Sequence, residues 1–185
     1  TVIPVPLAIR LLMMWIREEV LRRSMVPMYI KLEEKGELFR ADAKAEGDLV
    51  VVGGYRLRPG GTRESEWFSV TLTKESAPWA FWKGAPFKAI AALELYATLL
   101  CVVLLLPDLD GRGERFRLVL GGSTDNQGNE SVVKKLMTTK MPLCLVLMEL
   151  AAQLADKGAD LQLSWRRRNL NQEADDLTNF KFDDF

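Results

Sequence analysis

The most restrictive feature of this sequence is an apolar run, AALELYATLLCVVLLLP, which extends from Ala91 to Pro107 and holds one charged residue, Glu94. An unpaired carboxylate is costly to bury. Glu94 must therefore be exposed at one edge, be paired with a partner, or take part in a functional site. The run predicts a buried helix in the core, with a carboxylate one turn after its start.

The same run has nearly the length that a membrane span requires, because residues 89–106 are largely apolar. However, Lys88 and Glu94 lie in or beside the first turns, and the charged segment PDLDGRGERFR follows without an aromatic belt. Each charged group costs a few kcal/mol in a bilayer. The sequence therefore favours a core helix and predicts no membrane partner.

The composition excludes several classes of enzyme. Acidic and basic residues balance at 25 each, and histidine is absent. The lack of histidine excludes Ser-His-Asp and Cys-His mechanisms and removes the commonest zinc ligand. Any affinity for nucleic acid must come from a local basic patch, because the net charge is zero.

The two cysteines and the start of the chain indicate the cellular compartment of the protein. Cys101 and Cys144 lie inside apolar runs without metal-ligand spacing, which is typical of buried thiols in a reducing environment. The chain begins at Thr1 without a signal peptide. We therefore expect an intracellular protein, cytoplasmic or nuclear, and a piece of a longer chain.

Periodicity in the first half predicts one helix and three strands. The segment PLAIRLLMMWIREEVLRRSM has one apolar helical face. ELFRADA and DLVVVGGYRLR read as strands joined by the turn KAEG, and SEWFSVTLT alternates strictly after the Gly-rich link RPGGTRE. These three strands are expected to be antiparallel.

The second half predicts an alternation of helices and strands after the apolar run. RFRLVLGGSTDN reads as a strand, NESVVKKLM and PLCLVLMELAAQLADKGA as helices, and LQLSWRR as a fifth strand. NQEADDLTN is a short final helix, with Asn171 as its predicted N-cap. Strands reached through helical crossovers are expected to be parallel, so the whole pattern predicts an α/β fold.

Carboxylates occur at four places in this pattern. Asp42 lies in the first strand, Glu94 in the first core helix, Asp125 at the end of the fourth strand, and Asp175 and Asp176 in the last helix. An all-oxygen cluster suits Mg²⁺ or Mn²⁺ rather than zinc. Two such ions, about 4 Å apart, would activate a water and stabilise the leaving oxygen of a phosphodiester.

The ordered motifs ADA, LELYA, TDN and NQEADDL resemble the ribonuclease H fold, in particular the ribonuclease H domain of retroelement reverse transcriptases. The resemblance covers about residues 37–179. It implies a ribonuclease H-like domain over residues 36–185, with a five-stranded mixed sheet flanked by helices. Residues 1–35 are then a helical lead-in, expected to be a remnant of a preceding reverse-transcriptase or connection region.

The resemblance also implies an activity. The family hydrolyses the RNA strand of RNA–DNA hybrids with two Mg²⁺ ions, and its motifs match Asp42, Glu94, Asp125 and Asp175, with Asp176 as the alternate to Asp175. These residues are the expected catalytic and metal-binding groups, with Mg²⁺ or Mn²⁺ as cofactor. The expected partners are an RNA–DNA hybrid and the polymerase region of the same polyprotein.

Several basic and polar residues near these motifs are candidates for binding nucleic acid, since phosphate contacts position a duplex. They are Asn126, Lys134, Lys135, Arg166, Arg167 and Arg168. Gly53 and Gly54 in the second strand indicate either a close backbone approach or a β-bulge.

The sequence departs from the family pattern at two points. Many cellular members have a histidine in the loop before the last helix, where this chain has WRRRNLNQ, and an obvious basic protrusion is missing. Some retroelement domains also lack this histidine, so the departure predicts slower turnover and not a loss of activity. Two alternatives stay open: an inactive ribonuclease H-like module that binds nucleic acid or serves as a scaffold, and an integrase- or resolvase-like DNA nuclease. A scaffold would show no gain in melting temperature with Mg²⁺ or Mn²⁺.

Overall fold

The computed structural model describes residues 7–22, 31–82, 84–106 and 116–185. The chain forms two compact units, Thr1–Ile30 and Lys31–Phe185. In the first unit the described residues form one helix, α1 (Leu7–Arg22), as the apolar periodicity predicts. The rest of the segment before residue 31, and the charged segment at residues 107–115, lie outside the described residues.

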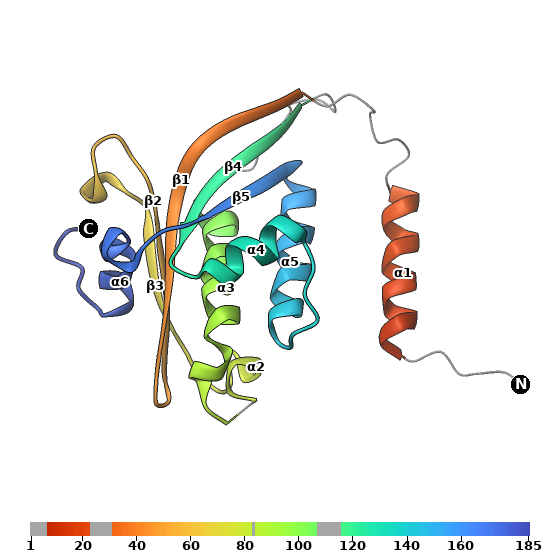
Figure 1. The fold of residues 1–185 in the computed structure, drawn as a ribbon, viewed down its shortest axis with the longest axis horizontal. Coiled ribbons are helices and arrows are strands. Elements are labelled where there is room, and N and C mark those ends of the chain that lie inside the picture. The colour runs from red at the N-terminus through yellow and green to blue at the C-terminus, as the bar shows by residue number, and fades with distance from the viewer. Residues whose placement is uncertain (1–6, 23–30, 83, 107–115) are drawn as a thin grey trace, which may run out of the picture. The chain divides into compact units, whose positions relative to one another are not determined.

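A five-stranded mixed sheet organises the second unit, in the order β3-β2-β1-β4-β5 (Figure 1). The first three strands, β1 (Lys31–Glu46), β2 (Leu49–Arg56) and β3 (Trp67–Leu72), are antiparallel neighbours. Strand β4 (Phe116–Thr124) runs parallel to β1, and β5 (Ala159–Trp165) runs parallel to β4.

The predicted arrangement of three antiparallel and two parallel strands is therefore confirmed. Strand β1 is longer than the predicted strand ELFRADA, because it begins at Lys31, within the residues that the sequence assigned to the lead-in. Its first part pairs with β4 from Lys31 onward, and this parallel partner is not visible in the local sequence pattern.

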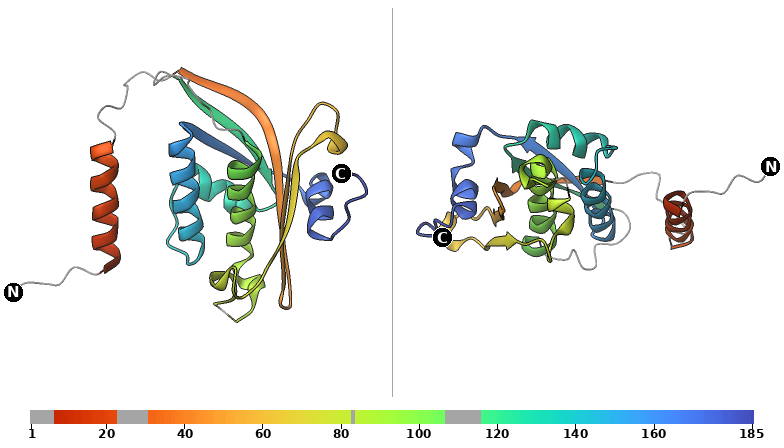
Figure 2. Two further views of the ribbon diagram at one scale, coloured as in Figure 1. Left: turned by 180° about the vertical axis from the view of Figure 1, so that it is seen from behind. Right: turned by 90° about the horizontal axis from the view of Figure 1, so that it is seen from below.

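Helices lie on both faces of the sheet (Figures 1 and 2). Helix α3 (Ile90–Leu100) follows the short α2 (Pro78–Phe81), contacts β1 and β2, and packs beside α5 (Leu143–Asp156). Helix α4 (Gln127–Lys135) contacts β5. Helix α6 (Gln172–Thr178) lies against β1, β2 and β3 on the face opposite α3.

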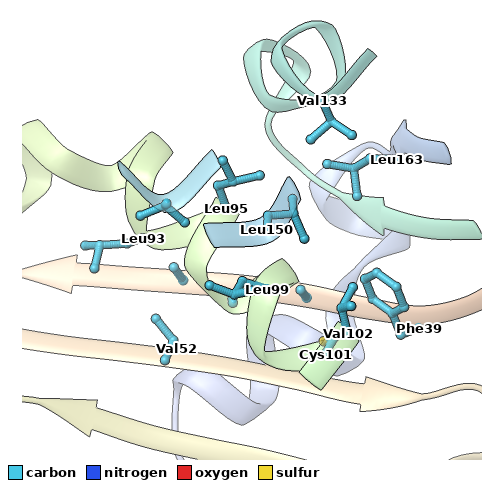
Figure 3. Close-up of a cluster of buried hydrophobic side chains, with 14 of the residues drawn as sticks. Phe39, Val52, Leu93, Leu95, Leu99, Cys101, Val102, Val133, Leu150 and Leu163 are labelled. Atoms are coloured by element: carbon cyan, nitrogen blue, oxygen red, sulfur yellow. The ribbon is translucent and has the colours of Figure 1, made fainter. Parts of the chain in front are cut away.

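The apolar run forms the centre of the core, as predicted. Helix α3 continues directly into a π-helical turn, Cys101–Leu105, and its side chains Leu93, Leu95 and Leu99 are buried beneath the sheet (Figure 3). The helical stretch Pro86–Leu105 is apolar and long enough to span a membrane, yet most of it is buried within the fold. This burial is the environment expected of a core helix in a folded domain.

Gly53 and Gly54 let both layers of helices approach the sheet closely. A Cβ atom at Gly53 would lie 3.0 Å from Cβ of Leu177 in α6, and one at Gly54 would lie 2.5 Å from Sγ of Cys101. The β1–β2 register is continuous through both glycines, so the bulge considered from the sequence is absent from this pair. Close approach is the correct interpretation.

Candidate active site

The end of the parallel pairing between β1 and β4 brings two of the predicted carboxylates together. The last paired residues are Arg40 and Ser123. Asp42 follows Arg40 by two residues within β1, so its side chain points to the same side of the sheet as that of Arg40, and Asp125 directly follows the last residue of β4. They lie just beyond the last paired residues of the two strands, and this position is called the fork between β1 and β4 below.

Helix α3 supplies Glu94 to this fork. Its neighbours Leu93 and Leu95 are completely buried, and Glu94 itself is only 6% exposed. Its carboxylate is 3.5 Å from Nδ2 of Asn129 in α4 and accepts a hydrogen bond from the side chain of Asn126. The charged residue of the apolar run is therefore buried, and it faces the other carboxylates rather than solvent.

The pKa values show that the carboxylates interact. Burial raises the pKa of Asp42 to about 7, and the charges of Asp125 and, more weakly, Asp175 add to this rise. Burial raises the pKa of Glu94 to about 8, again with contributions from Asp125 and Asp42. Like charges that face each other in a buried place disfavour ionisation, and a bound cation would relieve this repulsion.

The last helix distinguishes its two neighbouring aspartates. Asp175 acts electrostatically on Asp42, and its Oδ2 accepts a hydrogen bond of 2.9 Å from Nδ2 of Asn179. Oδ1 of Asp176 instead accepts a hydrogen bond of 3.0 Å from Nε2 of Gln172 and lies 3.5 Å from Nζ of Lys181. The geometry places Asp175 toward the fork and Asp176 away from it.

Asp125 has an unusual set of partners. Its Oδ2 accepts a hydrogen bond of 3.2 Å from Nε of Arg168, whereas its Oδ1 is buried and has no hydrogen-bond partner within the described residues. Its backbone carbonyl accepts from Nε1 of Trp165 at 3.1 Å. The carboxylate is thus held by β5 and its following loop, and one oxygen is still available to a ligand.

The residues present fit a hard divalent cation in chemistry, although they are not arranged as a compact ligand cluster. Within the described ranges, no three Asp, Glu, Cys or His residues lie close enough together to form a ready-made metal site. The donors are all carboxylate oxygens, one of them buried without a partner on Asp125. Such a donor set suits Mg²⁺ or Mn²⁺, and cation binding would draw these groups closer.

The basic residues proposed for nucleic-acid binding have different surroundings. The guanidinium of Arg166 donates a hydrogen bond of 2.9 Å to Glu37, and that of Arg168 is paired with Asp125. Arg167 is exposed. Lys134 and Lys135 are exposed in the last turn of α4, at least about 12 Å along the helix from Asn126 at its start.

The side chains of Asn126 and Asn171 make structural hydrogen bonds that the sequence did not predict. Oδ1 of Asn126 accepts from the backbone nitrogens of Gly128 and Asn129, so Asn126 is the N-cap of α4. Asn171 occupies the N-cap position of α6 as predicted, but its side chain makes no capping hydrogen bond. Its Nδ2 donates to the carbonyl of Ala41 at 3.2 Å instead, because Asn171 is buried against β1.

Three further polar groups around the site escaped sequence analysis. The hydroxyl of Thr178 donates to Oδ2 of Asp42 at 2.9 Å, and Nδ2 of Asn129 donates to the carbonyl of Ala91 at 2.9 Å. Thr178 follows Asp175 by one helical turn, a spacing that places both on one face and was the available signal. Asn129 offered no comparable signal, since its burial depends on α3.

The third group is a charged network at β1. Arg40 donates to Glu37 at 3.1 Å and to Glu173 of α6 at 3.3 Å, and Glu37 also pairs with Arg166. Hydrogen bonds from Ser123 and Arg40 keep the pKa of Glu37 below its ordinary value despite the opposing effect of burial. The network ties the loop before α6, and α6 itself, to the central strand.

Comparisons with known proteins support the fold rather than a sequence family. No protein-family model matches the chain, and no curated protein matches it in sequence. The structure of RNase H1 from the halophilic archaeon Halobacterium salinarum NRC-1 is 18% identical, with 84% of this chain and 100% of that chain covered and a TM-score of 0.47.

LC11-RNase H1, solved in complex with an RNA/DNA hybrid, is 14% identical, with 78% of this chain and 95% of that chain covered and a TM-score of 0.53. The N-terminal RNase H domain of rv2228c from Mycobacterium tuberculosis is 15% identical, with coverages of 78% and 91% and a TM-score of 0.47. The strand order and the similarity to LC11-RNase H1 lead to one conclusion: this chain has a ribonuclease H-like fold.

Proposed function

We propose that this chain is a divalent-cation-dependent endoribonuclease that hydrolyses the RNA strand of RNA–DNA hybrids. The observation that carries the proposal is the mutual electrostatic influence of Asp42, Glu94 and Asp125 at the fork between β1 and β4, with Asp175 beside them on α6. A protein of similar fold, LC11-RNase H1, was solved with an RNA/DNA hybrid, which supports the same class of substrate.

Asp42, Glu94, Asp125 and Asp175 would hold two cations, Mg²⁺ or Mn²⁺. Bound cations would supply Lewis-acid activation of water and neutralise charge on the phosphate. The chain provides the negative charge that attracts them. Thr178 and Asn126 favour the ionised forms of Asp42 and Glu94 by donating hydrogen bonds to them. Hydrolysis adds the water oxygen to phosphorus and breaks the bond to O3′, leaving a 3′-hydroxyl and a 5′-phosphate.

Basic residues would position the nucleic-acid backbone. Arg167 is exposed in the loop that also carries Arg168, close to the site, and is the first candidate for a phosphate contact. Lys134 and Lys135 are candidates for a more distant contact along α4. Asn126 caps a helix beside Asp125, so its role in substrate binding would be to keep α4 and Glu94 in place.

The biological setting that we propose is retroelement reverse transcription. The support is the motif NQEADDL, which resembles the final motif of retroelement ribonuclease H domains. In this setting the first unit, with α1, would continue from a reverse-transcriptase or connection region, and the polymerase region of the same polyprotein would be the partner. An intracellular location, cytoplasmic or nuclear, is part of this proposal.

The test is cleavage of an end-labelled RNA–DNA hybrid in Mg²⁺ and in Mn²⁺, with single-stranded RNA and duplex DNA of the same sequence alongside. We expect cleavage of RNA in the hybrid only. Asp125→Asn and Asp175→Asn should abolish cleavage, whereas Asp176→Asn, which lies outside the fork, should retain it. The aspartate pair on α6 thus supplies a matched control with the same chemical change.

Other outcomes would contradict the proposal in distinguishable ways. Cleavage of duplex DNA would indicate an integrase- or resolvase-like nuclease. No cleavage in either metal, from a folded sample whose melting temperature does not rise with Mn²⁺, would indicate a nucleic-acid-binding or scaffold module. Equal loss of activity in the Asp175 and Asp176 variants would contradict only the choice of Asp175 over Asp176 as the residue of α6 that serves the site.

A further inference from the structure

The ion pair between Arg168 and Asp125 sets Asp125 apart from the other carboxylates of the fork. In the part of the chain that the structure describes, Asp42 is held by the neutral hydroxyl of Thr178 and Asp175 by the amide of Asn179. Asp125 alone among these three has a cationic partner in that part, at 3.2 Å. A full positive charge therefore already sits on the carboxylate at the centre of the site.

The two members of this pair differ greatly in exposure. The side chain of Asp125 is 9% exposed, whereas that of Arg168 is 71% exposed. The anion is therefore fixed in the protein, and the cation reaches it from solvent. Arg168 makes a single described hydrogen bond to it, through Nε, so a change of side-chain rotamer is enough to release it.

Release of Arg168 does not require the loop to move. The backbone nitrogen of Arg166 donates to the carbonyl of Thr124 at 2.8 Å, and Nε1 of Trp165 donates to the carbonyl of Asp125 at 3.1 Å. The side chain of Arg166 is tied to Glu37. These bonds hold the end of β5 beside the end of β4, and Arg168 lies beyond them in a short 3₁₀ turn, Arg168–Leu170.

A divalent cation at this carboxylate would meet the charge of Arg168 at very short range. Oδ1 of Asp125 is buried without a described partner, and Oδ2 carries the guanidinium. Two cations on one carboxylate repel each other, and repulsion between charges a few ångströms apart is only partly screened at a half-buried site. Arg168 and a divalent cation would thus compete for the negative charge of Asp125.

We infer that Arg168 is a resident counter-ion of the site, which competes with the divalent cation for Asp125 and leaves Asp125 when the cation binds. This inference rests on the proposed function. The guanidinium lowers the repulsion among the carboxylates when the site has no metal, and it weakens cation binding. When a divalent cation takes the place of Arg168 at Asp125, a charge of +2 replaces a charge of +1 there. The guanidinium of Arg168 is then free beside the site.

The test uses Mn²⁺ alone, without nucleic acid, and measures its affinity by titration calorimetry for the unchanged chain, Arg168→Gln and Arg167→Gln. Both variants remove one positive charge from the same exposed loop, so they share any long-range effect on the net charge. We expect Arg168→Gln to bind Mn²⁺ about three- to tenfold more tightly, and Arg167→Gln to differ from the unchanged chain by less than about twofold.

Nuclear magnetic resonance supplies a second readout that does not depend on affinity. The Nε–H signal of Arg168 should shift and lose protection from solvent exchange when Mg²⁺ is added. The Nε–H signal of Arg166, whose guanidinium is paired with Glu37, should stay in place and serve as the internal control.

Equal Mn²⁺ affinities for the Arg168 and Arg167 variants, or an Arg168 signal unchanged at saturating Mg²⁺, would overturn the inference and leave the proposed function intact. Weaker Mn²⁺ binding by Arg168→Gln would likewise overturn it. Absence of Mn²⁺ binding in every sample, with Asp125→Asn indistinguishable from the unchanged chain, would overturn the metal dependence of the proposed function together with this inference.

Discussion

The hydroxyl of Thr178 lies 2.9 Å from Oδ2 of Asp42 and links the last helix to the central strand across a sequence separation of 136 residues. Asp42 is 2% exposed, and this hydrogen bond opposes the rise in its pKa caused by burial and by Asp125. Gly53, the partner of Asp42 in β2, allows Thr178 to approach, because a Cβ there would lie 3.3 Å from its methyl group.

Replacing Thr178 by valine should therefore raise the pKa of Asp42 above its value of about 7, because the methyl group cannot donate a hydrogen bond to the carboxylate. Thr178→Ser retains the hydroxyl and should leave the pKa close to that value. The measurement is a titration of the Asp42 carboxyl carbon by nuclear magnetic resonance in metal-free buffer. An unchanged pKa in the valine variant would show that the hydroxyl does not stabilise the carboxylate.

The metal-free protein should lose stability as the pH rises. Asp42 and Glu94 have pKa values of about 7 and about 8 in the folded state, above their ordinary values near 4. The folded state therefore holds protons that the unfolded state has released, so these two groups lower the free energy of unfolding progressively between about pH 4 and pH 8.

Melting curves in a chelator at pH 5.5 and pH 8.5 test this dependence. The melting temperature should be lower at pH 8.5, and Mn²⁺ should recover it there by offsetting the repulsion. Asp42→Asn removes one of the two groups and should reduce the difference between the two pH values. A melting temperature that is higher at pH 8.5 in the chelator would contradict the raised pKa values.

Adding a methyl group at Gly54 should destabilise the fold, because the new Cβ would lie 2.5 Å from Sγ of Cys101 and 3.1 Å from the carbonyl of Arg40. Overpacking of this kind costs about 1–3 kcal/mol. Chemical denaturation of Gly54→Ala measures the loss, and adding Cys101→Ala should recover part of it. Gly60→Ala should cost far less, because the atoms nearest to its new Cβ belong to the flexible carboxyl end of Glu64.

The C-terminal aromatic residues should stabilise α6. Phe185 packs edge-on against Tyr55 with ring centroids 5.4 Å apart, and it is partly buried against the cluster of Tyr55, Ala174 and Leu177, which joins α6 to β2. Phe185→Ala should cost about 1–2 kcal/mol and increase amide exchange in α6. Phe180→Ala is the matched control, because Phe180 is exposed and has Phe182 as its described aromatic neighbour. Equal losses would show that Phe185 has no specific role.

The sequence by itself determined the elements and their order. The alternation in SEWFSVTLT, the apolar run around Glu94 and the turn-rich links between segments are local patterns, and each reports directly on backbone period and burial. The carboxylates Asp42, Glu94 and Asp125, and the pair Asp175 and Asp176, were singled out because of the elements on which they lie, and the resemblance of NQEADDL to the family motif favoured Asp175 over Asp176. Local patterns also predicted Asn171 at the start of the last helix, but not the partner of its side chain.

Only the tertiary structure decided how these elements pair and which of their side chains are in contact. The start of β1 at Lys31 depends on its pairing with β4, the pairing of Arg168 with Asp125 depends on β5 lying beside β4, and the contact between Thr178 and Asp42 depends on α6 crossing β1. Each of these contacts joins residues far apart in the chain. Local periodicity does not encode such contacts, because they arise from packing of the sheet and its two helical layers.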